Sequence, residues 1–282
     1  VDNIDVDDAT DGLIAAGGVV ELYPSGGVVS PLLSSAIVGY TDAPIACHVV
    51  IRIPKTYARS FPKVEVIVQG LAVYDPRVPT TAYSDNPVLA MADIAVRAGW
   101  SVNWASVEEG ADFDDELVGG VKRRTLGLSL VEPRPAEEWA KVFRVYTGCF
   151  IVWENGELKF IPDKAMTLPG DLTQTIDVNA IVAGTFRMRR RNPSNFPTTV
   201  IVEYRDSSDD NNWRTERAVV ETEGVLSARV SRVSLPGIHN YAQAYREAKE
   251  RLNKFSKDLI VEATLFDEAL ELQIGSIVRI IH

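Results

Sequence analysis

The spacing of hydrophobic residues predicts a helix over about residues 135–146, near the middle of the chain. Apolar side chains recur there at intervals of three and four residues, so they lie on a single face of a helix. That face consists of Trp139, Val142, Phe143 and Tyr146. Gly148 follows as a residue that commonly ends helices. One side of this helix should therefore pack against the rest of its domain.

A β-hairpin is predicted directly after this helix. Two apolar runs, Cys149–Trp153 and Leu158–Ile161, flank the dipeptide Asn155-Gly156. Asn-Gly between such runs favours a tight type I′ turn, because both central residues of that turn need a positive φ. Helix and hairpin together form one predicted unit.

Two more helices are indicated, each by its first residues. Asn86-Pro87 offers an N-cap followed by proline at the first helical position, and Gly99 ends the helix. This helix is apolar on most faces, which predicts burial at the centre of a domain. Asn240 begins a longer helix, whose predicted apolar stripe is Tyr241, Ala244, Tyr245, Ala248, Leu252 and Phe255. Its predicted solvated side is Glu247, Lys249, Glu250, Arg251 and Lys254.

The remaining pattern is that of short strands and turns. Strands are predicted at 48–53, 64–74, 198–204, 213–220, 228–233, 259–266 and 276–281. The strands at 48–53 and 64–74 are expected to pair, and those at 198–204 and 213–220 to form a long hairpin. Residues 1–41 read as short strands separated by turns at Gly17-Gly18 and Gly26-Gly27.

These elements predict an α+β fold of mostly antiparallel, β-barrel-like or sandwich-like domains with about three helices. A chain of 282 residues is long for a single hydrophobic core. We expect a β-rich segment at 1–82, an α+β domain with the helix and hairpin at 83–165, and a β-rich domain with one long helix at 166–282. The last of these is expected to pair with the first. The start without Met and the strand at the end suggest a piece of a longer chain.

Composition narrows the classes of function. The chain is 46% hydrophobic and 24% charged, which is ordinary for a globular protein, and no apolar run is long enough to span a membrane. The net charge of −10 argues against a nucleic-acid clamp and would suit a surface past which DNA slides. Cys47 and Cys149 are too few for a disulfide framework and are expected to be buried, small apolar residues.

No set of residues predicts a catalytic, cofactor or metal site. His48, His239 and His282 lack neighbours at metal-ligand spacing, and Asp5–Gly12 fails as a calcium loop. The cluster Asp112, Asp114, Asp115 and Glu116 could hold a cation, but is better explained as the start of a helix that buries Leu117 and Val118. Gly17-Gly18 and Gly119-Gly120 lack the lysine and hydroxyl of a P-loop.

Two features could serve binding. The run Arg187–Arg191, with Met188 inside it, could meet an anionic partner, although a strand with arginines beside acidic neighbours explains it more simply. Trp100 and Trp104 could stack on a sugar, but packing in a core or a subunit interface is the simpler use of such side chains.

The order of several short motifs resembles the central tail-tip attachment proteins of long-tailed bacteriophages, the lambda-type tip family. Gly70–Arg77 followed by Tyr83–Pro87 is similar to a strand and helix start of that family. The hairpin segment Val152–Asp163 is similar to another family motif. The likeness continues in order through Phe186, Asn192, Val200–Tyr204, the helix at 241–255 and Gly275–Val278. It covers about residue 46 to the end, but matches poorly between Trp100 and Pro133. Gly275-Ser276 also stands where the family often has Gly-Asp.

The resemblance implies a homotrimeric hub in the virion that closes the tail tube and bears no cofactor. Its implied partners are the distal tail protein, the tail tube, the tape-measure protein and, through C-terminal regions missing here, a host receptor. DNA would only pass through, and no stable membrane insertion is implied. Two alternatives stay open. One is a tail-associated hydrolase that acts on the bacterial envelope, which would need a pocket joining a carboxylate pair or His239 to a nucleophile, and the other is a receptor- or glycan-binding module using Trp100, Trp104 and Trp213.

Overall fold

The computed structural model describes residues 17–23, 27–41, 48–55, 70, 72–130, 132–164, 172–192, 196–208, 214–223, 229–257, 259–267, 272 and 274–281. The chain divides into two units, residues 1–68 and 69–282. The three domains expected at 1–82, 83–165 and 166–282 stay a prediction.

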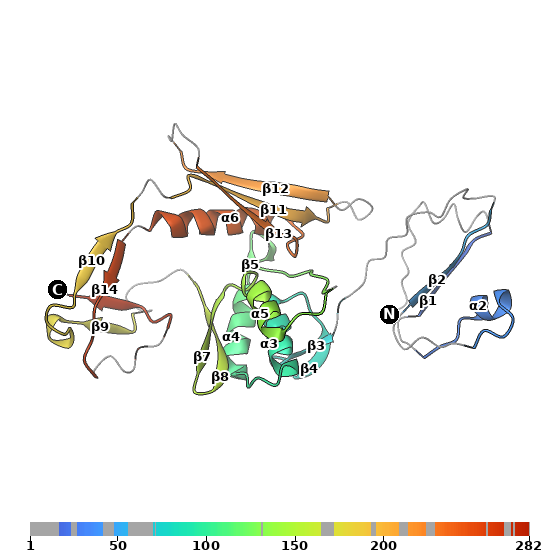
Figure 1. Ribbon diagram of the computed structural model, residues 1–282, viewed down its shortest axis with the longest axis horizontal. Helices are drawn as coiled ribbons and strands as arrows, with labels where there is room; N and C mark the ends of the chain where they lie inside the picture. The colour runs from blue at the N-terminus through green and yellow to red at the C-terminus, as the bar shows by residue number, and fades with distance from the viewer. Residues whose placement is uncertain are drawn as a thin grey trace. The chain divides into compact units, whose positions relative to one another are not determined.

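The first unit contains a two-stranded antiparallel sheet and a short helix (Figure 1). Strand β1 (Val19–Tyr23) pairs with β2 (His48–Arg52). Helix α2 (Pro31–Ala36) was not predicted, although Ser30 caps it by accepting a hydrogen bond from the Leu33 N–H and Pro31 takes the first position. The expected partner of the 48–53 strand, residues 64–74, lies outside the described residues except for Gly70 and 72–74.

Three helices pack together at the start of the second unit (Figure 1). They are α3 (Pro87–Arg97), α4 (Trp104–Asp115) and α5 (Ala136–Arg144). Asn86 caps α3 as predicted: its side chain accepts hydrogen bonds from the N–H groups of Val88 and Leu89. The core around α3 contains Val88, Leu89, Met91, Val107, Ala111, Phe143 and Phe160. The predicted central position of α3 is confirmed.

Hairpins surround these helices. Strands β3 (Ala72–Asp75) and β4 (Thr80–Tyr83) form one, and β5 (Leu117–Val118) and β6 (Val121–Lys122) form another. The hairpin of β7 (Cys149–Glu154) and β8 (Glu157–Pro162) is the predicted one. Asn155 and Gly156 have φ values of 52° and 83°, as a type I′ turn requires. The helix-and-hairpin unit is therefore confirmed.

A three-stranded sheet covered by one long helix follows (Figure 1). Strand β11 (Thr199–Asp206) lies between β12 (Arg214–Glu221), which is antiparallel to it, and β13 (Val230–Leu235), which is parallel. Helix α6 (Tyr241–Ser256) packs on β11 and β12 and begins at the predicted cap, Asn240. Val200, Val202, Tyr204, Ala218, Ala244 and Ala248 are at the centre of this second core.

The last elements form two short strand pairs. Strand β9 (Gln174–Ile176) is parallel to β15 (Val278–Ile280), and β10 (Arg187–Arg190) is antiparallel to β14 (Leu259–Glu262). A 3₁₀ turn, η1 (Val178–Ala180), follows β9. Ile176, Ala180 and Ile181 make a small core there with Phe186 and Leu265 beside it.

The predicted α+β class is confirmed, with two differences in detail. The described residues contain five α-helices rather than about three, because α2 and α4 were not expected. Their sheets have two or three strands each, mostly antiparallel, and none closes into a barrel within the described ranges.

Candidate interaction surfaces and the charged seam

A buried ionic seam fastens the segment after α4 to helix α6. Arg124 is nearly fully buried and donates to Glu247 at 2.7 Å and to Glu250 at 2.5 Å. Arg251 reaches the same Glu247 at 2.7 Å. Burial would raise the pKa of Glu247, but Arg124 and Arg251 together hold that pKa below its ordinary value. A buried carboxylate with two guanidinium partners stays charged, so the seam is an ion pair rather than a neutral contact.

Neighbouring polar side chains of α6 hold the backbone of the same segment. Gln243 accepts from the Thr125 N–H and hydroxyl and donates to the Thr125 carbonyl at 2.9 Å. Arg246 donates to the carbonyls of Lys122 and Arg123. The helix therefore presents a polar face to residues 118–125, and Glu247 belongs to this face. The prediction that Glu247 lies on the solvated side of the helix is wrong.

The predicted apolar stripe of α6 is only half correct. Ala244 and Ala248 are fully buried, whereas Tyr241 and Tyr245 are 54% and 39% exposed. Both small residues let the helix approach the sheet closely. The polar face beside them had no signal in the sequence, because its partner Arg124 lies more than 120 positions earlier.

Asp114 is a second buried acid at the seam. Its side chain is fully buried and accepts from the Gly148 N–H at 3.1 Å, while its second oxygen has no hydrogen-bond partner. Arg124 Nε lies 3.9 Å from Asp114 Oδ1. Burial raises the pKa of Asp114 to about 7, against the opposing effect of Arg124. A raised pKa can mark a catalytic acid, but this one is closed to solvent and therefore to substrate.

The acidic cluster around Asp114 ends a helix rather than starting one. Asp112, Asp114 and Asp115 occupy the last turn of α4, and Leu117 is 68% exposed. The predicted helix start with buried Leu117 and Val118 is therefore wrong. Arg77 pairs with both Asp112 and Asp115, and Lys122 with Asp115, which explains how a helix C-terminus tolerates these acids.

The other candidate ligands and nucleophiles do not converge in the described residues. Cys149 is buried as predicted, and burial raises its thiol pKa, so it is not an activated nucleophile. His239 packs against Gly127, and burial lowers its pKa. The described residues contain no group of three metal-ligating side chains. Cys47, His282, Asp5–Gly12 and the side chain of His48 lie outside the described residues.

The tryptophans take separate aromatic partners. Trp100 packs against the first core and meets Trp153 edge-on, with ring centroids 5.7 Å apart. Trp104 is 36% exposed and meets Tyr74 at 5.2 Å. Packing in a core, which was the simpler interpretation, is confirmed for Trp100. Trp104, Tyr74, Val96 and Asp93 line a shallow hollow instead. Trp213 lies outside the described residues.

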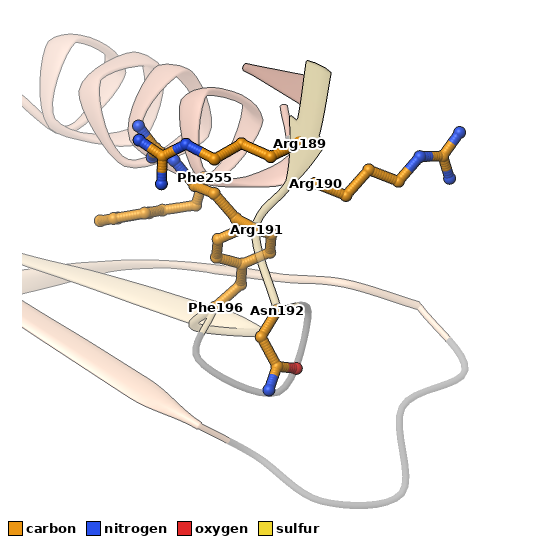
Figure 2. A pocket seen from close by; sticks show the side chains of 6 residues that line it. All are labelled: Arg189, Arg190, Arg191, Asn192, Phe196 and Phe255. Atoms are coloured by element: carbon orange, nitrogen blue, oxygen red, sulfur yellow. The ribbon is translucent and has the colours of Figure 1, made fainter. Parts of the chain in front are cut away.

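The first four residues of the arginine run, Arg187–Arg190, form strand β10 and are all exposed. The predicted strand with exposed arginines beside acidic neighbours is confirmed. Arg189 donates to Glu262 of the neighbouring strand at 2.8 Å. Arg189 and Arg190 extend to opposite sides of the strand (Figure 2). The residues at the end of the strand line an open hollow with two aromatic rings, and they are Arg189, Arg190, Arg191, Asn192, Phe196 and Phe255.

Residues 135–282, more than half of the chain, match the family model described as "Putative phage tail protein". The chain therefore belongs to this phage tail protein family. No curated protein sequence matches it. No helix in the described ranges is long and apolar enough to cross a membrane.

The solved structures that are similar to the chain include the following three. A chain of the virion of the native gene transfer agent particle is 12% identical with a TM-score of 0.61, and the match covers 99% of this chain and 67% of that one. The tail protein from Neisseria meningitidis MC58 is 14% identical with a TM-score of 0.45, over 70% of this chain and 57% of that one. The prophage MuSo2 43 kDa tail protein from Shewanella oneidensis is 13% identical with a TM-score of 0.40, over 71% of this chain and 55% of that one. Only the first likeness is close enough to support a shared fold.

Proposed function

We propose that the chain is a non-enzymatic structural part of a tail tip. In this role it forms a homotrimeric hub that closes the tail tube, joins it to the receptor-binding parts and encloses the path of the tape measure and DNA. The distal tail protein and the tail tube are its neighbours on one side. Receptor contact belongs to other parts of the tip.

The observation that carries the proposal is the likeness along 99% of the chain to a component of a virion, the native gene transfer agent particle. Membership of the phage tail family supports it. The ordered motifs from residues 70–77 to 275–278 favour the tip over other parts of a tail.

The charge of the chain fits this role. With 39 acidic and 29 basic residues, the protein repels a polyanion except near concentrated arginines. The perturbed groups Asp114 and Glu247 are used inside the framework, where they fasten one part of the second unit to another. They fit a rigid structural part better than a hydrolase.

Light scattering of the purified chain over a range of concentrations tests the trimer. The hub proposal predicts a mass three times that of the monomer that persists on dilution. A mass that stays monomeric up to high concentration contradicts self-assembly of this segment. Release of sugar or peptide from purified cell envelopes would instead favour the hydrolase.

A further inference from the structure

The ribbon of strands β10 and β14 has one uncovered apolar face. Met188 lies opposite Val261, and Arg190 opposite Leu259, so these four side chains project from the same face. Met188 is 63%, Leu259 50% and Val261 37% exposed. Arg190 is exposed as well. These four residues are called the ribbon patch below.

A two-stranded ribbon is marginal by itself and needs a third strand or a packed face to be stable. The opposite face of this ribbon carries the Arg189–Glu262 ion pair, while the patch lies open. The patch combines methionine and arginine with aliphatic side chains and has no acidic residue. The buried centre of protein interfaces has a similar composition. The patch therefore fits a protein partner better than it fits solvent.

The charge of the chain indicates which protein partner would bind the patch. The run at 187–191 holds four arginines, and without them the net charge of −10 would be −14. Of these four arginines, Arg190 belongs to the patch, and the rest of the chain carries a net negative charge of the opposite sign. Glu108 and Glu109, for example, are exposed on α4 and form no ion pair with any described residue. A second copy of the chain carries the same acidic residues, and it is present wherever the patch is present.

We propose that the ribbon patch is the contact surface for a second copy of this chain, an inference that rests on the proposed hub function. The contact is heterologous, with the patch of one copy against an acidic surface of the next. A trimer needs this kind of contact, because a two-fold contact uses the same surface on both copies and closes as a dimer. Heterologous contacts close into rings such as a trimer.

The test is light scattering on a patch variant and a matched control. The patch variant combines Met188→Asp with Arg190→Glu. The control combines Val230→Asp with Arg232→Glu. These two residues are likewise an exposed apolar residue and an exposed arginine two positions apart on one strand, β13. Both variants change the net charge by the same amount. Circular dichroism and thermal melting establish that each variant is folded.

We expect the wild type and the control to form the trimer. In the patch variant the concentration at which half of the chains assemble should rise at least about tenfold. A folded patch variant that assembles like the wild type overturns the inference and leaves the hub proposal standing. A wild-type dimer, or a monomer that binds a single-stranded oligonucleotide through the patch, also overturns it. The hub proposal is tested separately, by the position of the protein in the particle.

Discussion

Asp114 brings a carboxylate into the protein interior with one hydrogen bond for its two oxygens. The cost of its charge is reduced by Arg124 and by the Gly148 N–H, but burial still raises its pKa to about 7. An acid whose folded pKa lies above its unfolded value of about 3.9 stabilises the fold most when it is protonated. That contribution is complete below about pH 4 and is lost as the pH rises through 7.

Replacing Asp114 with Asn should therefore flatten the pH dependence of stability. Asn keeps an acceptor for the Gly148 N–H but does not titrate. Relative to this variant, the wild type should lose free energy of unfolding between pH 5 and pH 8, as measured by urea denaturation. Asp112→Asn, at a side chain that is 71% exposed, is the control. Parallel stability curves for the wild type and Asp114→Asn would show that the buried carboxylate does not titrate in this range.

Gly127 leaves room for the ring of His239. A Cβ atom added at this position would lie 2.0 Å from His239 Cε1, which is far inside contact distance. We expect Gly127→Ala to lower the free energy of unfolding by about 1–3 kcal/mol through overpacking. Gly70→Ala is the matched control, since its added Cβ would lie 3.7 Å from Tyr83. Equal unfolding midpoints for these two variants would contradict the close packing of Gly127 on His239.

At the scale of elements, the sequence predicted those helices and hairpins whose first residue or turn is set by residues next to it in the chain. Asn86-Pro87, Asn155-Gly156 and Asn240 each fix a start or turn through local hydrogen bonds or a positive φ, and all three stand where expected. Helix α4 was missed because its buried side includes Ser106, Gly110 and Asp114, which do not form an apolar stripe. Its burial depends on the hairpin β7–β8 and not on its own pattern.

Pairing between distant strands was also beyond the sequence. Strand β13 pairs in parallel with β11, and β15 pairs in parallel with β9. The hydrophobic pattern of a strand does not indicate which partner it takes or whether the pairing is parallel. The seam is a similar case, since neither Arg124 nor Glu247 differs locally from a solvated residue. The arginine run could be predicted as an exposed strand, because this prediction depends only on residues that are neighbours in the sequence.

The seam should be worth more than an ordinary surface ion pair. Arg124→Leu leaves Glu247 buried with Arg251 as its remaining partner, and breaking such a pair costs about 3–5 kcal/mol. Arg251→Leu removes the more exposed partner of the same carboxylate, leaves Arg124 in place and should cost less than Arg124→Leu. Urea denaturation of both variants measures the difference. If the two substitutions cost the same, Arg124 does not fasten the segment to α6.

At the scale of the whole molecule, the second unit contains both the ion-paired framework and the open, arginine-bearing ribbon. The seam holds α6 to residues 118–125, and the ribbon follows directly from the end of α6 at β14. This arrangement fits the proposed hub function.

The position of the protein in the particle tests the central claim most directly. Antibodies raised against this chain, applied to intact tailed particles that encode it and visualised by immunogold electron microscopy, report that position. The account predicts gold at the tip of the tail, distal to the tube, and no labelling of particles from a deletion strain. Gold along the tail shaft or at the capsid would contradict the hub proposal.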